Sequence, residues 1–265
     1  MAEILPTNFI HDQEAVMPGI EPSAPYTIFE PVVKHHEADG SVRLLNAEET
    51  LAQMQDFVTA CDISPGYVIP LGGGDTHTLK DVVDDGAAAF ISEIDSIAPA
   101  PEALPAILLN AAELAERSGF AADKAVYRAS IMSTATSKNP NLTTHSDGLS
   151  GIVKEDTRSA KKIRLVYPIG PGSIIFPRHQ GEDIYGDVDY ESTTAITALG
   201  ELSELEKINS PRITEITPEQ QLDVDAQQVL PGRILAFDPT RTFWHQAPEV
   251  TTNRTALIID ISQTD

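Results

Sequence analysis

A histidine and an aspartate stand two residues apart in "TTHSD", where His145 and Asp147 follow the turn-rich stretch "TSKNPN". In an extended strand, side chains two positions apart project from the same face, so these two would lie ~7 Å apart and point the same way. Imidazole and carboxylate groups both bind divalent transition metals. A His-x-Asp pair also occurs in surface loops, where the two side chains form an ordinary hydrogen bond. A metal site therefore requires a third ligand elsewhere in the chain.

His245 is the strongest candidate for that third ligand. It stands in "LPGRILAFDPTRTFWHQAPEV", where a Pro-Gly turn precedes one apolar strand and a second, "TALIIDIS", follows. The other histidines lie in polar or proline-rich segments typical of surface residues: His11, His35, His36, His77 and His179. Two histidines and one carboxylate leave up to three coordination positions open. This is the facial arrangement of non-haem Fe(II) oxygenases.

Arg254 follows His245 by nine residues and begins the last apolar strand, in "TTNRTALIID". A guanidinium in such a setting can hold the carboxylate of a small organic acid through two parallel hydrogen bonds. The other interpretation is a structural ion pair with a carboxylate of the protein.

The elements that must position these residues change in character along the chain. The first forty residues are rich in proline and indicate an arm laid over a core. Residues 47–60 show helical spacing of apolar side chains, and 80–118 are alanine-rich and helical. From about 121 onward, short β-branched runs alternate with Pro-Gly and Asp-Pro turns, which predicts a β-barrel or sandwich. We expect a mostly β fold with flanking helices.

Domain organisation follows from this change. Residues 1–120 are expected to form an arm and helices that pack on a β core at 121–265, with an insertion near 198–228. We expect the two parts to form one integrated domain. The segment "IPLGGGDTHTL" and the insertion are predicted to be lid-like loops at the rim of the core.

The amino-acid composition limits the classes of partner that the protein is expected to bind. The chain has 265 residues, 40 acidic against 18 basic, and a formal net charge of −22. Such a charge repels phosphate backbones and anionic lipids, so we expect no nucleic-acid or membrane partner. The single cysteine, Cys61, excludes an internal disulfide. The acidic N-terminus lacks the basic region of a secretory signal, which predicts a cytoplasmic protein.

The segments "HSD", "PGRILAFDPTRTFWHQAP" and "NRTALIIDIS" resemble the Fe(II)- and 2-oxoglutarate-dependent dioxygenase superfamily over about residues 125–262. The resemblance implies a double-stranded β-helix, of the jelly-roll or cupin-like kind. It implies that His145, Asp147 and His245 bind Fe(II) and form the catalytic centre, and that Arg254 binds the distal carboxylate of 2-oxoglutarate. The implied reaction uses O2 to oxidise a small-molecule or peptide substrate, and releases succinate and CO2.

Three further residues are candidate contacts for the co-substrate. Members of the superfamily with an Arg-x-Ser motif have a hydroxyl two positions after the arginine, where this chain has alanine. Thr255, or a hydroxyl from another strand, would have to replace it. Tyr167 and Arg164 are candidates in "KIRLVYP", but strand alternation places them on opposite faces, so only one can face the pocket. The alternative function is a cupin-like barrel that binds a metal or small ligand without oxygenase activity.

Overall fold

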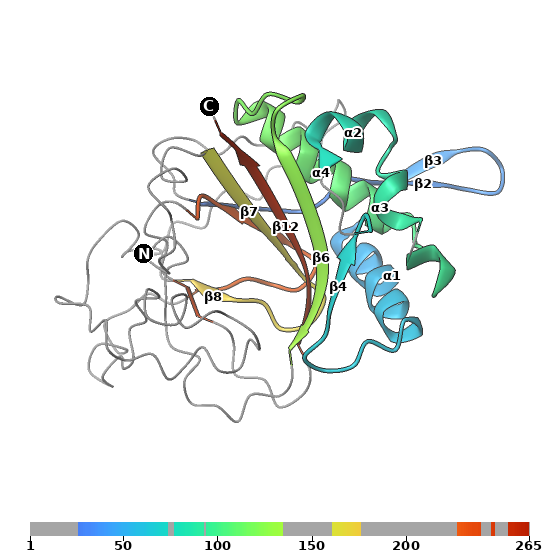
Figure 1. The fold of residues 1–265 in the computed structure, drawn as a ribbon. Helices are drawn as coiled ribbons and strands as arrows, with labels where there is room; N and C mark the ends of the chain where they lie inside the picture. Colours follow the sequence, from blue (N-terminus) through green and yellow to red (C-terminus); the bar gives the residue numbers. More distant parts are fainter. Residues whose placement is uncertain are drawn as a thin grey trace, which may run out of the picture.

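The computed structural model describes residues 26–73, 77–92, 94–134, 161–175, 227–239, 245–246 and 254–264. These residues form a mostly β structure with antiparallel sheets (Figure 1). The helices lie on one side of the largest sheet, and strand β8 lies on the other.

The largest sheet has seven strands, in the order β1-β10-β7-β12-β6-β4, with β5 also paired to β6. Its long central strands come from the β-branched runs of the C-terminal half. The strands are β1 (Tyr26–Phe29), β4 (Val68–Leu71), β5 (His77–Thr78), β6 (Val126–Thr134), β7 (Lys161–Pro168), β10 (Ile234–Phe237) and β12 (Arg254–Gln263). Every pairing in this sheet is antiparallel.

A second sheet of three short strands has the order β11-β8-β9, also antiparallel. Its strands are β8 (Ile174–Ile175), β9 (Gln227–Gln228) and β11 (His245–Gln246). A separate hairpin of β2 (Val33–His36) and β3 (Val42–Leu45) projects beyond the helices. The described residues thus contain two sheets that can enclose a site, without a closed barrel.

The helical layer consists of α1 (Ala47–Ala60), α2 (Leu79–Asp84), α3 (Ala88–Ile91), α4 (Ala103–Arg117) and a 3₁₀ turn, η1 (Ile94–Ser96). Helix α1 begins at a capping box, because the Asn46 side chain accepts from the Glu49 amide and the Glu49 side chain accepts from the Asn46 amide. Its Met54 and Phe57 are buried. Helix α4 is apolar over most of its circumference, as its burial between the sheet and the other helices requires.

The two faces of the seven-stranded sheet contribute to different buried clusters, because side chains alternate along each strand. Tyr127, Leu165, Tyr167, Leu257 and Ile259 face the helices. The second cluster faces the second sheet and comprises Val166, Ile175, Val229, Leu235, Phe237 and Ala256. A residue on these strands can therefore be assigned to one side or the other by its position relative to these neighbours.

The structure differs from the expected order of helices first and strands second. Strand β1 lies in the proline-rich segment and pairs with β10, and β4 pairs with β6, so the N-terminal half supplies both edges of the largest sheet. The region 80–118 is helical as expected, and comprises α2, α3, a 3₁₀ turn and the 15-residue α4. Edge strands are stabilised by hydrogen bonds to their neighbours, so their own composition indicates them weakly.

The segment "IPLGGGDTHTL" was predicted to be a lid-like loop, but its described residues include two paired strands. Strands β4 and β5 both pair with β6, and the His77 ring packs on Phe90 with ring centroids 4.6 Å apart. Gly72, with a φ of +76°, allows the chain to turn so that its carbonyl oxygen lies 3.0 Å from His77 Nε2. This packing is on the helical side of the sheet. Most of the predicted lid at 200–228 lies outside the described residues.

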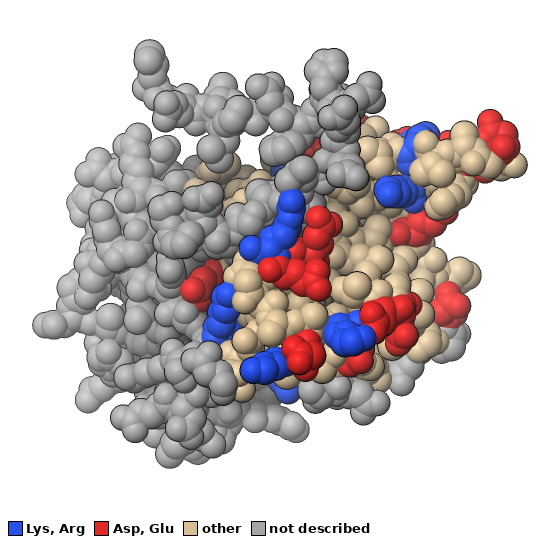
Figure 2. All heavy atoms as spheres, turned by 90° about the horizontal axis from the view of Figure 1, so that it is seen from above, with Lys and Arg blue, Asp and Glu red and all other residues tan. Residues whose placement is uncertain are grey.

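Charged side chains of both signs are interspersed over the described part of one face of the molecule (Figure 2). Several are paired, including Arg43 with Glu37 at 2.7 Å and with Glu49 at 2.9 Å. Within the described residues, no helix has the length and apolar character needed to cross a bilayer.

Candidate functional site

Arg254 is the first residue of β12 and lies on the side of the sheet that faces β8, since Ala256 two positions later belongs to the second buried cluster. Its Nε donates to the carbonyl oxygen of Pro171 at 3.2 Å, and its Nη2 donates to Ser173 Oγ at 2.9 Å. Burial lowers the pKa of the guanidinium, because the charged form loses hydration.

His245 lies in the second sheet and faces the same side of the largest sheet. It is directly opposite Ile175 in the β11–β8 pair, and residues directly opposite each other project from the same face. Ile175 is fully buried in the second cluster. The His245 ring accordingly packs on Phe237 of β10, with ring centroids 5.4 Å apart. The imidazole is therefore directed between the two sheets.

Strand β8 and the residue before it connect the two functional side chains. Ser173 contacts Arg254, and Ile175, which is opposite His245, follows two positions later on the same face. Two residues of extended chain correspond to ~7 Å.

The surroundings of this space are apolar. Phe237, Leu235, Val166 and Ala256 line it from the larger sheet, and each is at least nine-tenths buried. In such a low-dielectric environment an ionic contact between a guanidinium and a carboxylate is stronger than in water, and an unmatched charge is more costly.

Tyr167 and Thr255 lie on the opposite side of the sheet from Arg254. Tyr167 belongs to the cluster under the helices, and Thr255 alternates with Arg254 and Ala256. The Tyr167 hydroxyl is buried and has no hydrogen-bond partner among the described residues. Burial raises the pKa of this phenol. The structure therefore directs neither side chain to the side of the sheet on which Arg254 and His245 lie.

Arg164 is on the same face as Arg254 but far from it along the sheet. Its Nε donates to Asp260 Oδ1 at 2.7 Å and its Nη2 to Asp260 Oδ2 at 3.1 Å, a bidentate pair across β7 and β12. Asp260 is six residues after Arg254 on β12, which corresponds to ~20 Å. Of the two candidates in "KIRLVYP", Arg164 is the one on this face, and it is already engaged by a carboxylate.

Two buried tyrosines give a direct test of these placements. The Tyr127 hydroxyl donates to the Leu108 carbonyl oxygen at 2.8 Å, whereas that of Tyr167 has no described partner. We expect Tyr127→Phe to lower the free energy of unfolding by about 1 kcal/mol, and Tyr167→Phe to leave it unchanged or raise it. Parallel urea unfolding curves measure both. An equal loss in the two variants would contradict the placement of the Tyr167 hydroxyl, and 2-oxoglutarate affinity should survive Tyr167→Phe.

The other two predicted metal ligands, His145 and Asp147, lie outside the described residues. Within the described residues, no group of three histidine, cysteine or acidic side chains is placed to hold a metal ion. The metal site therefore remains a prediction of the sequence, of which only His245 has a described position.

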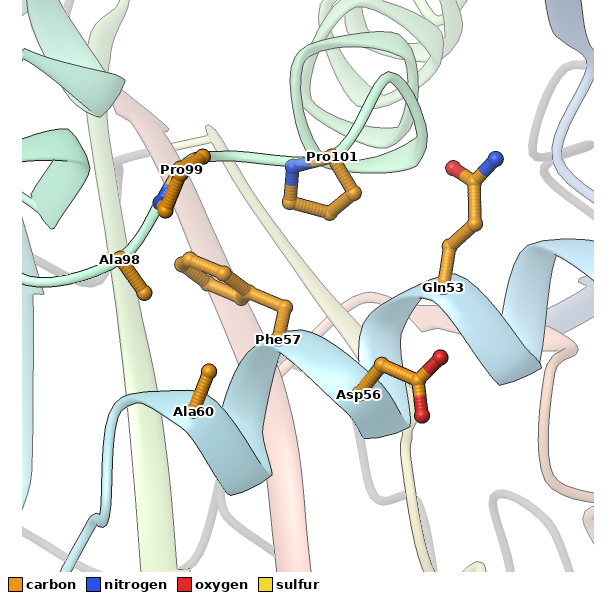
Figure 3. Close-up of a pocket in the computed structure, with 7 residues that line it drawn as sticks. All are labelled: Gln53, Asp56, Phe57, Ala60, Ala98, Pro99 and Pro101. Carbon is orange, nitrogen blue, oxygen red and sulfur yellow. The ribbon is translucent and has the colours of Figure 1, made fainter.

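An open hollow of about 370 Å³ lies elsewhere, between α1 and the segment that leads to α4 (Figure 3). Phe57 extends toward Ala98 and Pro99 across it. Its lining residues are Gln53, Asp56, Phe57, Ala60, Ala98, Pro99 and Pro101. This hollow lies in the helical layer, on the other side of the largest sheet from Arg254.

Sequence reasoning did not identify Ser173. The alanine two positions after Arg254 indicated that a hydroxyl from elsewhere was needed, but "IGPGSII" carries no motif that marks its serine. Only the folding of this turn against the start of β12 brings the Ser173 hydroxyl to the guanidinium.

No protein-family model matches the chain, and no curated protein matches it. The chain is similar to solved structures of 2-oxoglutarate-dependent non-haem enzymes. EvdO2 from Micromonospora carbonacea var. aurantiaca, also solved with 2-oxoglutarate, is 10% identical, with 91% of this chain and 86% of that chain covered and a TM-score of 0.44. The alpha ketoglutarate-dependent carbocyclase SnoK from nogalamycin biosynthesis is 12% identical, with 90% and 80% covered and a TM-score of 0.37.

Proposed function

We propose that this protein is a non-haem Fe(II)- and 2-oxoglutarate-dependent oxygenase. It hydroxylates or otherwise oxidises a small-molecule or peptide substrate with release of succinate and CO2. The observation that carries the proposal is that Arg254 and His245, from two different sheets, both lie on the side of the largest sheet that carries the second buried cluster. The sequence pattern assigns a carboxylate-binding role to one of them and a metal-binding role to the other.

The described residues fit the co-substrate at its distal end. A carboxylate there would accept from the Arg254 guanidinium, and the apolar neighbours would exclude water that competes for the same hydrogen bonds. At the other end, the His245 imidazole is a ligand type that suits iron. His145 and Asp147 complete the proposed ligand set on the strength of their spacing in the sequence.

The same proposal gives the two sheets a more specific interpretation. In a double-stranded β-helix, two antiparallel sheets face each other and hold the site between them. The order β10-β7-β12-β6 in one sheet and β11-β8-β9 in the other supports this architecture, because strands that follow one another in the chain alternate between the sheets from β7 to β8 and from β9 to β10. We propose this fold for the β core.

In the proposed mechanism, the bound cofactors and the side chains of the protein have different roles. Iron, 2-oxoglutarate and O2 supply the oxidising power when they are bound. Arg254 would hold 2-oxoglutarate through its distal carboxylate and so orient it in the site. Phe237 packs on the His245 ring and limits its rotation, while Val166 and Ala256 keep the enclosed face dry.

The decisive experiment measures co-substrate turnover. Anaerobic Fe(II) and 2-oxoglutarate should give the weak visible charge-transfer band of a chelated complex, and admission of O2 should then yield succinate against a panel of amino acids, peptides and lipids. Protein loaded with Zn²⁺ is the matched control, because this ion binds similar ligands without redox chemistry. Iron binding without the band and without succinate would contradict the proposal and favour the cupin-like alternative.

A further inference from the structure

Basic side chains gather at one end of the largest sheet, where the first residues of β6 and β7 lie beside the last residues of β12, near the C-terminus (Figure 1). Arg128 of β6 is directly opposite Asp260 of β12, and Asp260 is directly opposite Arg164 of β7. Two positions further along β12, Ser262 is directly opposite Lys162 of β7. Three cations therefore lie around one carboxylate, in a protein with 40 acidic and 18 basic residues. The balance of charge at this end of the sheet is the reverse of that in the whole chain.

These side chains project from one face of the sheet. Side chains alternate along a strand, and the intervening residues Ile163 and Ile261 belong to the buried cluster under the helices. The basic side chains therefore lie on the side away from the helices. Arg128 is exposed, and Lys162 and Ser262 are partly exposed. All three retain access to a molecule in the solvent.

The carboxylate in this group is already engaged by one of the arginines. Arg164 donates two hydrogen bonds to Asp260, of 2.7 and 3.1 Å. Among the described residues, neither Arg128 nor Lys162 has an ion-pair partner. Cations on neighbouring strands repel one another, which lowers stability unless an anion offsets the repulsion. The arrangement therefore indicates a binding role for Arg128 and Lys162 rather than a structural one.

Ser262 places a hydroxyl between these two cations. Lys162 is directly opposite it, with Cβ atoms ~5 Å apart, and Arg128 is its diagonal neighbour on the other adjacent strand, at ~7–8 Å. Long side chains at these spacings can reach one small group. The ammonium, the guanidinium and the hydroxyl all donate hydrogen bonds. Donors from three strands suit a phosphate group, with its three acceptor oxygens, better than a planar carboxylate with two.

We propose that Arg128, Lys162 and Ser262 form a binding site for the phosphate group of a small molecule. The ligand is small because the net charge of −22 repels a long polyanion. A single phosphate is affected less, since charges more than ~8 Å away are largely screened at physiological ionic strength, whereas the two cations contact it directly. The site does not depend on the proposed oxygenase reaction, because Asp260 lies ~20 Å from Arg254 along β12.

The test titrates inorganic phosphate into the metal-free protein and follows the NMR chemical shifts of the backbone amides. The largest shifts should occur at the first residues of β6 and β7 and the last residues of β12. In the double variant Arg128→Gln/Lys162→Gln the dissociation constant should rise roughly 10-fold, because two hydrogen bonds to a charged group are lost at a partly exposed site. Ser262→Ala should raise it by a smaller factor.

Succinate tests the selection for phosphate, because it is a dianion whose charges are carried by planar carboxylates. It should bind more weakly than phosphate to the wild-type protein, and equal affinities would contradict the assignment of a phosphate site.

The double variant Lys34→Gln/Lys80→Gln is the matched control. It removes the same charge from the β2–β3 hairpin and from the helical layer, so its phosphate affinity should match wild type. Without phosphate, Arg128→Gln/Lys162→Gln should unfold at the wild-type temperature or slightly above it, because the substitutions remove a repulsion. A lower unfolding temperature would indicate a structural role for the two cations and would contradict the proposal.

Three further results would overturn the phosphate site. The first is an equal phosphate affinity in wild type and Arg128→Gln/Lys162→Gln. The second is an equal loss in the control double variant, which would indicate an effect of net charge alone. The third is a set of shifts that centres on the start of β12 and disappears in Arg254→Ala, which would place the anion at the candidate functional site. None of these measurements involves succinate formation, so the proposed function stands or fails separately.

Discussion

Replacement of Asp147 or His245 by alanine is expected to lower the affinity for Fe(II) by roughly 100-fold or more, so that iron is lost on desalting. Removal of a group that only supports a ligand typically costs 10- to 100-fold in metal affinity, and removal of a ligand itself should cost at least as much. His145→Ala is expected to behave in the same way. Iron content after gel filtration, measured by a colorimetric chelator, reports the loss directly.

His77→Ala is the control for this series. His77 is a half-buried histidine on the helical side of the sheet, where it packs on Phe90 and lies 3.0 Å from the Gly72 carbonyl oxygen. Its replacement should remove comparable aromatic packing and leave iron content unchanged. Circular dichroism should show a folded protein in all four variants, because a metal held by a preformed β core is not needed to fold it. Full iron content in Asp147→Ala would contradict the assignment of Asp147 as a metal ligand.

The sequence predicted the elements that depend on local pattern. The apolar spacing and acidic first turn at 47–60 indicated a helix. Helix α1 spans these residues, and a capping box between Asn46 and Glu49 starts it. The β-branched runs around Val126–Thr134 and Arg254–Gln263 are the longest strands of the largest sheet. In these segments local preference and tertiary structure agree, which is why periodicity sufficed.

The elements that the sequence did not predict depend on a partner. Strand β1 lies among prolines, and β4 precedes a run of glycines, yet each forms because a neighbouring strand offers unpaired backbone groups. Alternation predicted that Tyr167 and Arg164 face opposite ways, but not which one faces the second sheet. The side depends on which face the helices cover, and that is a property of the packed molecule.

The residues of the candidate site also differ in whether the sequence could predict them. Arg254 could be found because it begins a strand at a characteristic distance from His245. Ser173 could not, because its contact with Arg254 depends on a turn that wraps around the start of β12, and no residue spacing encodes that contact. Sequence pattern identifies residues whose roles repeat at fixed offsets along strands. It misses partners that a connecting turn supplies.

Arg254→Ala is expected to retain iron and the fold while the binding free energy of 2-oxoglutarate weakens by roughly 2–4 kcal/mol, about 30- to 1,000-fold in dissociation constant. The reason is the buried position of the guanidinium. Burial already lowers its pKa, and a carboxylate in the same apolar space would interact with it with little competition from water. Titration of 2-oxoglutarate into the iron-loaded protein without O2 measures the change.

Arg164→Ala separates this effect from a general loss of positive charge. Arg164 is on the same sheet face but is paired with Asp260, ~20 Å from Arg254 along β12, so its removal should leave 2-oxoglutarate affinity within about twofold. The pair is partly exposed, and its loss should lower stability by no more than about 1 kcal/mol. If Arg254 instead serves a structural ion pair, Arg254→Ala will lower the melting temperature and leave 2-oxoglutarate binding nearly unchanged. Equal affinities in wild type and Arg254→Ala would remove the main reason to regard this protein as a 2-oxoglutarate-dependent oxygenase, since a metal at His245 alone is equally compatible with a non-oxidising barrel.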